Sequence, residues 1–468
     1  MRKAALQLWI SRFEGNEQVV LQIIVDCSPL LKGGHMRDRM ETKSVVILRR
    51  TLGAALSLFF LIGGLQAQQV VENSDKPLSK NAGRGLPLQP PFGIAPQRAE
   101  WKGKIETENG VKVIKNPKEP LYGEIIFDLE EELTIGNKND ENYAFYGGLC
   151  LAVDKEENIF VLDRANSRIQ NYDRNGHYRM TIGRKGQGPG EFQNLGSAFI
   201  DSKNSLYVDQ SYSISVFDNK GKYIRSIPLE THIYSFGITA DGNIIATTST
   251  VVATKITEDI VLFDSLGKKL KTIASFPNPR VKLASGVALG ARNRVAPYLY
   301  FCPLNEKQGV YGFSSEYKLY IIDSSGNNIS IIEKDEIPAP LTKKDREDTL
   351  DAEIDYFKKN GILLSKKEIA KTYPFPSHKP FYNSLQTDDR GNIYVTRIDL
   401  GSGKKNPFSY DLFSINGYFL YKIILSEVVL TVIFKDRYIF ATKPDKETGY
   451  SKVIKYRIKN WDQIKKGI

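Results

Sequence analysis

The sequence predicts an all-β fold, a six-bladed β-propeller with four-stranded blades. A unit of about 45 residues recurs along the chain: Gly176 and Gly221 lie 45 positions apart, and Gly221 and Gly267 lie 46 apart. Within each unit, runs rich in β-branched and aromatic residues alternate with turns of Asn, Asp and Gly. Repeats of this length, each with four strand-like runs, are typical of propeller blades.

The clearest copies of the unit span residues 147–183 and 197–227. Each is predicted to form strand, turn, strand, loop, strand, Gly turn and strand. Asp173 precedes the turn residue Gly176 by three positions, and the same spacing places an acidic residue before each of the next marked glycines. Because Asp and Gly at this offset favour one type of tight turn, the pattern predicts the same hairpin in successive blades. The equivalent acidic residues are Asp218, Asp264 and Asp323.

The chain contains six such units, and the last one is incomplete. They begin near Gly148, Gly196, Phe236, Ala296, Phe381 and Val429. The sixth has only three predicted strands. The segment from Ile125 to Ile135 ends in Thr-Ile before Gly136, as the outer strand of the first unit ends in Thr-Ile before Gly183. We therefore expect this N-terminal strand to complete the last blade and close the ring, which hides sheet edges that would otherwise be exposed.

Residues 148–228 resemble the NHL repeat. The resemblance is carried by Asp163-x-x-Asn166-x-Arg168 and by the glycine-rich connector from Gly183 to Phe192. Over about 120–460 the chain resembles six-bladed propeller proteins that bacteria export, a family largely of unassigned function. The resemblance implies a fold and an exported location, and no activity. Since Asp163, Asn166 and Arg168 belong to the repeat motif, we interpret them as a network that braces a loop.

The N-terminal region has the pattern of an export signal. Arg49 and Arg50 precede an apolar run over residues 51–65, and Ala67 provides a small residue at a cleavage point. The run is shorter than the ~20 residues that a membrane-spanning helix needs. We expect cleavage near Ala67 and a periplasmic, extracellular or cell-surface protein that does not span the membrane.

The chain of 468 residues is expected to contain one folded domain. We assign residues 1–67 to the leader, 68–118 to a polar, proline-containing linker, and 119–468 to the propeller. Met36 and Met40 are alternative starts to Met1, and a start at Met40 would leave residues 1–39 untranslated.

Residues 334–380 form a predicted helical insertion between blades four and five. Thr342 is placed to cap a first helix that ends at Asn360-Gly361. Ser365 and Glu368 have the spacing of a capping box and predict a second, shorter helix. Two interpretations stay open: a cap that packs on the ring, or a lid over a ligand site.

Strand parity assigns the loops to two faces of the ring. In a four-stranded blade, the first-to-second and third-to-fourth turns lie on one face, and these are short here. The other loops and the connectors between blades lie on the opposite face, which we call the loop face. Its long segments are residues 164–168, 184–194, 210–213, 230–234, 277–294, 334–380 and 397–406. Because binding groups concentrate on loops held by a rigid frame, we expect a ligand there, at the mouth of the central channel.

Six off-motif side chains on the loop face are the candidate ligand-binding residues: Arg164, Tyr212, His232, Arg294, His378 and Arg397. The net charge of +11 favours an anionic partner, such as an acidic glycan, a peptide or an envelope protein. Nucleic acid is not expected for an exported chain. These observations predict a monomeric binding or scaffold protein.

The alternative function is a metal-dependent lyase or hydrolase on the same fold. A catalytic zinc usually has three protein ligands, and only His232 and His378 of the four histidines are expected on the loop face. We therefore predict no metal site and no cofactor, with Zn²⁺ or Ca²⁺ as the ions of the alternative. Cys150 and Cys302 fall in blades one and four and are expected to stay unpaired.

Overall fold

The computed structural model describes residues 6–10, 21–25 and most of 100–464. Within the last range it leaves out 253–254, 279–280, 283–287, 290–294, 360, 374, 398–408, 427–428, 430 and 446–448. The chain divides into two units, residues 1–62 and 63–468. In the first, β1 (Leu6–Ile10) pairs antiparallel with β2 (Leu21–Val25). The predicted signal segment, including Ala67, lies outside the described residues.

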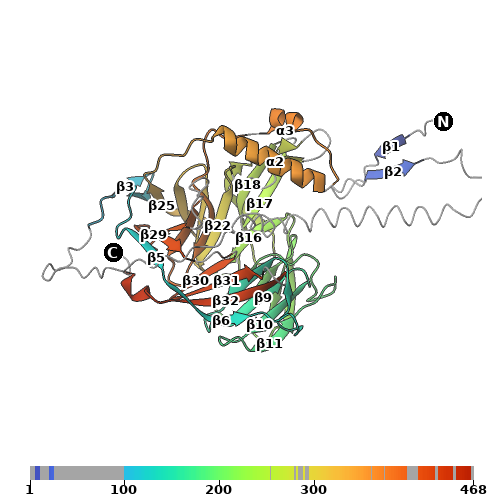
Figure 1. Cartoon of the computed structure of the whole chain (residues 1–468), viewed down its shortest axis with the longest axis horizontal. Helices are drawn as coiled ribbons and strands as arrows, with labels where there is room; N and C mark the ends of the chain where they lie inside the picture. Colours follow the sequence, from blue (N-terminus) through green and yellow to red (C-terminus); the bar gives the residue numbers. More distant parts are fainter. Residues whose placement is uncertain are drawn as a thin grey trace, which may run out of the picture. The chain divides into compact units, whose positions relative to one another are not determined.

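The second unit is a propeller of six four-stranded blades, as predicted (Figure 1). Blade one consists of β8 (Leu149–Val153), β9 (Ile159–Asp163), β10 (Arg168–Tyr172) and β11 (Tyr178–Ile182). Blade two consists of β12 (Ala198–Ile200), β13 (Leu206–Asp209), β14 (Ser213–Phe217) and β15 (Tyr223–Pro228). Blade three consists of β16 (Ile233–Ile238), β17 (Ile244–Val252), β18 (Lys255–Phe263) and β19 (Lys269–Pro277).

The second half of the ring follows the short pair β20 (Val281–Lys282) and β21 (Ala288–Leu289). Blade four consists of β22 (Leu299–Asn305), β23 (Gln308–Phe313), β24 (Lys318–Asp323) and β25 (Asn328–Lys334). Blade five consists of β26 (Tyr382–Thr387), β27 (Ile393–Arg397), β28 (Ser409–Phe413) and β29 (Phe419–Leu425). Blade six begins with β30 (Val432–Lys435), β31 (Tyr438–Pro444) and β32 (Tyr450–Ile458).

The repeated Asp and Gly build the third-to-fourth-strand turns. Asp173 Oδ1 accepts hydrogen bonds from the backbone N–H groups of Asn175 and His177, both at 2.9 Å. Gly176 takes a positive φ of 82°, which a residue without Cβ adopts at low cost. The same two bonds recur at Asp218, Asp264 and Asp323. The period seen in the sequence is therefore the period of one hydrogen-bonded turn.

Neighbouring blades pack face to face through apolar side chains. Ile169 of blade one and Val208 of blade two, for example, are fully buried in one shared cluster. Complete burial of such a side chain is worth about 1.5–3 kcal/mol. The first strands of most adjacent blades contact one another, which makes them the innermost strands around the axis.

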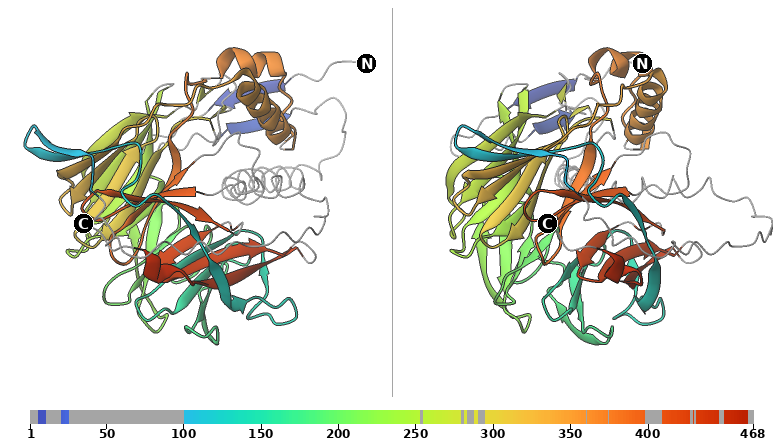
Figure 2. Two further views of the ribbon diagram at one scale, coloured as in Figure 1. Left: turned by 60° about the vertical axis from the view of Figure 1, so that its left-hand side comes forward. Right: turned by 90° about the vertical axis from the view of Figure 1, so that its left-hand side faces the viewer.

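The N-terminal part of the propeller unit adds strands to three successive blades. β4 (Val111–Asn116) runs parallel to β25 of blade four, and β3 (Lys104–Glu108) pairs with β4 (Figure 2). β5 (Glu124–Phe127) runs parallel to β29 of blade five. Residues 104–116 were assigned to the linker from the sequence but are strands. The alternation of apolar and polar residues that predicts a strand is weak here, because β3 is exposed along its whole length apart from its central residue, Glu106.

Ring closure by an N-terminal strand is confirmed, although only residues 129–135 of the predicted strand 125–135 take part, since residues 125–127 belong to β5 in blade five. β6 (Leu129–Ile135) pairs antiparallel with β32 and supplies the fourth strand of blade six. Ile135 is only 1% exposed and packs with Val453 of the same blade and Tyr172 of blade one. β7 (Phe145–Tyr146) pairs with the start of β32. The two ends of the propeller thus share one sheet.

Disrupting β6 should open the ring, whereas the same change in β3 should not. We expect Ile135→Asp to lower the melting temperature by roughly 10 °C or more, because it places a charge between blades six and one. Ile105→Asp is the matched control, since Ile105 is 46% exposed on the added strand β3. Thermal melting and light scattering measure both. Equal melting of Ile135→Asp and wild type would contradict closure by β6.

Candidate binding face

The insertion forms two helices on a paired stem. α2 (Lys343–Lys359) and α3 (Lys366–Thr372) lie together beyond the strands (Figures 1 and 2). Leu341 N–H donates to Ser377 at 3.1 Å and Lys379 N–H donates to Ala339 at 2.8 Å. These two hydrogen bonds hold residues 339–341, which lead into α2, against residues 377–379, which follow α3. None of the helices in the described residues is long and apolar enough to cross a membrane.

Both predicted helix starts are confirmed. Ser365 and Glu368 form a reciprocal capping box at α3. Thr342 Oγ1 accepts the backbone N–H of Asp345 at 3.1 Å, and the Asp345 carboxylate accepts the N–H of Thr342 at 2.9 Å. Lys379 then forms an ion pair with Asp345 at 2.9 Å, which holds the returning stem against the first turn of α2.

A carboxyl group is buried in the small apolar core of the insertion. Glu353 of α2 is 5% exposed, beside a cluster that includes Phe357 and Ile369. The Tyr373 hydroxyl donates to one oxygen at 3.5 Å, a weak contact, and the second oxygen has no hydrogen-bond partner in the structure. Burial raises the pKa of Glu353 from 4.5 to about 7, although the Tyr373 hydroxyl opposes this.

The base of the insertion is fixed by a buried charged cluster between blades four and five. Lys334, the last residue of β25, contacts Asp411 at 2.7 Å and Glu336 at 2.9 Å. Arg397, at the end of β27, forms an ion pair with Glu336 and lies 3.6 Å from Asp411. The Tyr317 hydroxyl donates to Asp411 at 2.5 Å. The predicted ligand residue Arg397 is therefore engaged within the fold.

Arg164 is also engaged by its own chain. Its guanidinium donates to the carbonyls of Leu195 and Gly196, both at 3.1 Å, and so holds the connector between blades one and two. Burial raises the pKa of the neighbouring Asp209 to about 7. Backbone hydrogen bonds from Ser211 and from Ser197, together with the charge of Arg164, favour the ionised form.

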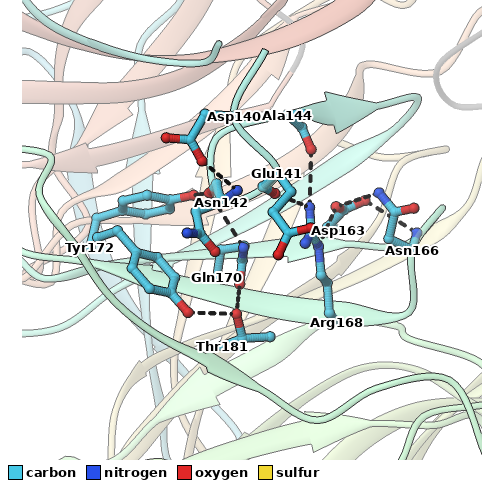
Figure 3. Close-up of polar contacts among 11 residues, drawn as sticks. Asp140, Glu141, Asn142, Ala144, Asp163, Asn166, Arg168, Gln170, Tyr172 and Thr181 are labelled. Carbon is cyan, nitrogen blue, oxygen red and sulfur yellow. Dashed lines mark hydrogen bonds and ion pairs between the residues drawn. The ribbon is translucent and has the colours of Figure 1, made fainter. Parts of the chain in front are cut away.

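The motif residues Asp163, Asn166 and Arg168 brace a loop, as interpreted from the sequence (Figure 3). Asp163 accepts from the Asn166 amide at 2.8 Å and from Arg168 Nε at 3.1 Å. Arg168 also donates to the carbonyls of Glu141 and Ala144, at 2.8 and 3.1 Å. The network thus joins the first blade to the segment that follows the closing strand β6.

The loop face carries a hollow of about 330 Å³ between blades two and three. Its lining residues are Tyr212, Glu230, Thr231, His232, Tyr234, Ser249, Val251 and Ile256. The His232 ring contacts two tyrosine rings: its centroid lies 5.5 Å from that of Tyr212, at an interplanar angle of 83°, and 4.6 Å from that of Tyr234. The Tyr212 side chain remains 57% exposed. The hollow therefore exposes the Tyr212 ring to solvent beside the His232 ring, and the two rings form a corner.

Backbone hydrogen bonds hold the hollow in shape. Leu229 N–H donates to the carbonyl of Tyr212 at 2.8 Å, and Ile233 N–H donates to that of Ser211 at 3.0 Å. Gln210 N–H donates to the carbonyl of Ser213 at 2.8 Å and so closes the loop that carries Tyr212. The connector from blade two to blade three is thus pinned to the loop that presents Tyr212.

The six predicted ligand residues do not gather at one place. Tyr212 and His232 meet in the hollow, whereas Arg164 and Arg397 bind protein groups elsewhere. His378 lies on the insertion stem, where its Nδ1 is 2.9 Å from the Ser377 hydroxyl. Arg294 lies outside the described residues. Sequence analysis missed Tyr234 and Ser249, because Tyr234 lies near the start of β16, Ser249 lies within β17, and neither belongs to a motif.

Among the described residues, no group of three or more His, Cys, Asp or Glu side chains is arranged to hold a metal ion. Cys150 and Cys302 are unpaired, as expected. Burial raises the pKa of the Cys302 thiol to about 11, so this thiol stays protonated at neutral pH and is a poor nucleophile.

Comparisons with known proteins support the fold. A family model, DUF5128, described as "6-bladed beta-propeller", matches residues 149–280. A search of curated proteins found no match.

Similar solved structures include a candidate exported protein of Bacteroides fragilis. It is 14% identical with a TM-score of 0.44, and the match covers 74% of this chain and 99% of that one. A DUF4221 member from Bacteroides vulgatus is 12% identical with a TM-score of 0.43, covering 71% and 98%. Virginiamycin B lyase from Staphylococcus aureus is 11% identical with a TM-score of 0.35, covering 71% and 99%.

The insertion should lose stability as pH rises, because of Glu353. Its pKa is higher in the folded state, so folding favours the protonated form; stability is greatest below pH 4.5 and falls as pH rises to about 7. Glu353→Gln should therefore stabilise the insertion at pH 8, by on the order of 3 kcal/mol, and have no effect near pH 4.5.

Hydrogen exchange of the α2 amides measures this difference in the intact protein. Glu347→Gln is the matched control, since Glu347 is exposed on the same helix and should change little at either pH. A Glu353→Gln protein that opens as readily as wild type at pH 8 would show that the buried carboxylate does not weaken the insertion.

Proposed function

We propose that this chain is an exported β-propeller that binds a ligand on its loop face, in the hollow of Tyr212, His232 and Tyr234. The observation that carries the proposal is the cluster of three partly accessible aromatic rings in one hollow. Its volume of about 330 Å³ lies at the lower end of the ~300–1,000 Å³ typical of ligand sites. A small ligand, or one unit of a glycan or peptide, suits this size.

The rigid support of the hollow favours binding over a passive surface role. An exposed aromatic ring held by a closed loop loses little conformational entropy when a ligand contacts it. The hollow also lies on the face to which strand parity assigns the long loops and the insertion. The proposed activity is binding, and it does not include the lyase or hydrolase alternative.

The expected preference for an anion is not part of the proposal for this hollow. That preference was based on the net charge of +11, and two of the loop-face cations, Arg164 and Arg397, are engaged within the fold. The charged residue that the hollow presents among its described lining is Glu230, a carboxylate. An anionic glycan or peptide would meet repulsion there.

Export is the part of the proposal that rests on Arg49, Arg50, the apolar run and Ala67. We expect the mature protein to begin at or near Gln68. N-terminal sequencing of protein recovered from the periplasm or culture medium measures this directly. Recovery of an intact N-terminus from residues 41–67 in the membrane fraction would contradict it.

Binding should depend on the loop face and not on the opposite face. On an array of glycans and peptides, Tyr212→Ala should weaken the bound ligand tenfold or more, about 1.4 kcal/mol or above. Lys155→Ala, Arg174→Ala and Lys220→Ala, in tight turns of the opposite face, should bind like wild type. Arg397→Ala should lower stability by about 1.5–3 kcal/mol, because it leaves Lys334 to balance the carboxylates of both Asp411 and Glu336.

Two results would contradict the proposal. One is loss of binding in the opposite-face variants with normal binding by Tyr212→Ala. The other is a protein that binds nothing on the array while it is folded by thermal melting.

A further inference from the structure

We infer that the hollow of Tyr212, His232 and Tyr234 recognises an uncharged sugar ring within a glycan chain. This inference rests on the proposed function and specifies the class of its ligand. It is carried by three features of the lining: the corner of aromatic rings, the hydroxyl and carboxylate groups beside it, and the raised wall from blade three.

The aromatic corner matches the two-sided chemistry of a sugar ring. A pyranose has faces of C–H groups and an edge of hydroxyls, so it can lie on an aromatic ring while its hydroxyls turn to polar groups. Tyr212 meets His232 nearly at a right angle, 83°, and the Tyr234 ring contacts His232 at an interplanar angle of 52°. One ring can therefore serve as a floor and the next as a wall.

The polar lining fits hydroxyls better than any charged group. Thr231 and Ser249 line the hollow, and a hydroxyl can both donate and accept. The Glu230 carboxylate can accept from a sugar hydroxyl, and hydrogen bonds to an ionised acceptor are about twice as strong as neutral ones. The same carboxylate would repel a uronate or a sulfated sugar. The lining thus selects a neutral, hydroxyl-rich ligand.

Blade three supplies a wall through a hairpin that is longer than the equivalent hairpin of blade one. β17 and β18 are nine residues each, against five for the equivalent β9 and β10 of blade one. Val251 and Ile256 are cross-strand partners near the end of this long hairpin, and both line the hollow. Val251 is 55% exposed. A wall on one side with an open rim on the other admits one unit of a chain that continues into solvent.

The test is affinity electrophoresis of the whole protein through gels that contain one polysaccharide each. The uncharged probes are dextran, mannan, xylan and mixed-linkage β-glucan, and the acidic probe is polygalacturonate. We expect at least one uncharged polysaccharide to retard the protein. Tyr212→Ala should weaken this retardation tenfold or more, whereas Tyr212→Phe, which keeps the ring, should stay within about threefold of wild type. Thermal melting confirms that each variant is folded.

Glu230→Gln separates hydrogen bonding from charge. This variant keeps an acceptor, so it should still be retarded by the uncharged probe and should lose its discrimination against polygalacturonate.

The inference is overturned if polygalacturonate alone retards the wild-type protein, or if no polysaccharide does. In either case, a peptide or acidic ligand whose binding Tyr212→Ala removes would leave the proposed function standing and refute only the sugar class. If an uncharged polysaccharide binds but Tyr212→Ala binds it as wild type does, both the sugar site and the proposed hollow are wrong.

Discussion

The pairing of β6 with β32 is the contact on which the remaining structure depends. Six blades enclose an axis only if the last one packs against the first, and without β6 the outer edge of β32 in blade six would be unpaired. β6 brings Ile135 into the space between these blades. The network of Asp163 and Arg168 then holds the segment that follows β6 (Figure 3). Closure and the first blade thus stabilise each other.

Because the ring is closed, the strands that flank each loop are fixed, and the loops together form a defined surface. The connector at residues 229–233 keeps its shape because both strands that flank it are fixed in blades. The buried charges of Lys334, Arg397 and Asp411 act in the same way at the insertion, where they join its base to blade five. Such a cluster contributes geometry more than net stability, since burying charges offsets much of their attraction.

Sequence analysis predicted correctly those features that depend on residues close together in the chain or on the repeat. The Asp–Gly turns, the six units, the capping box at Ser365 and the closing strand all depend on residues close in sequence or on a repeat. β3 and β4 were missed, because β4 pairs with the distant strand β25 and β3 is largely charged and exposed. The predicted strand over residues 125–135 is divided in two, because β5 pairs with the distant strand β29 of blade five. The partners of Arg164 and Arg397 were missed for a related reason: Arg397 lies 61 positions from Glu336. The hollow combines three segments, of which only Tyr212 and His232 stood out.

Hydrogen–deuterium exchange of the full chain, with and without a bound oligosaccharide, tests the account most directly. It follows every loop at once and needs no substitution. The account predicts slower exchange at residues 210–213, 229–234 and 249–256 on binding, with the tight turns of the opposite face unchanged. Protection confined to residues 155–158, 174–176 and 219–221 would contradict it, because the binding surface would then lie on the other side of the ring.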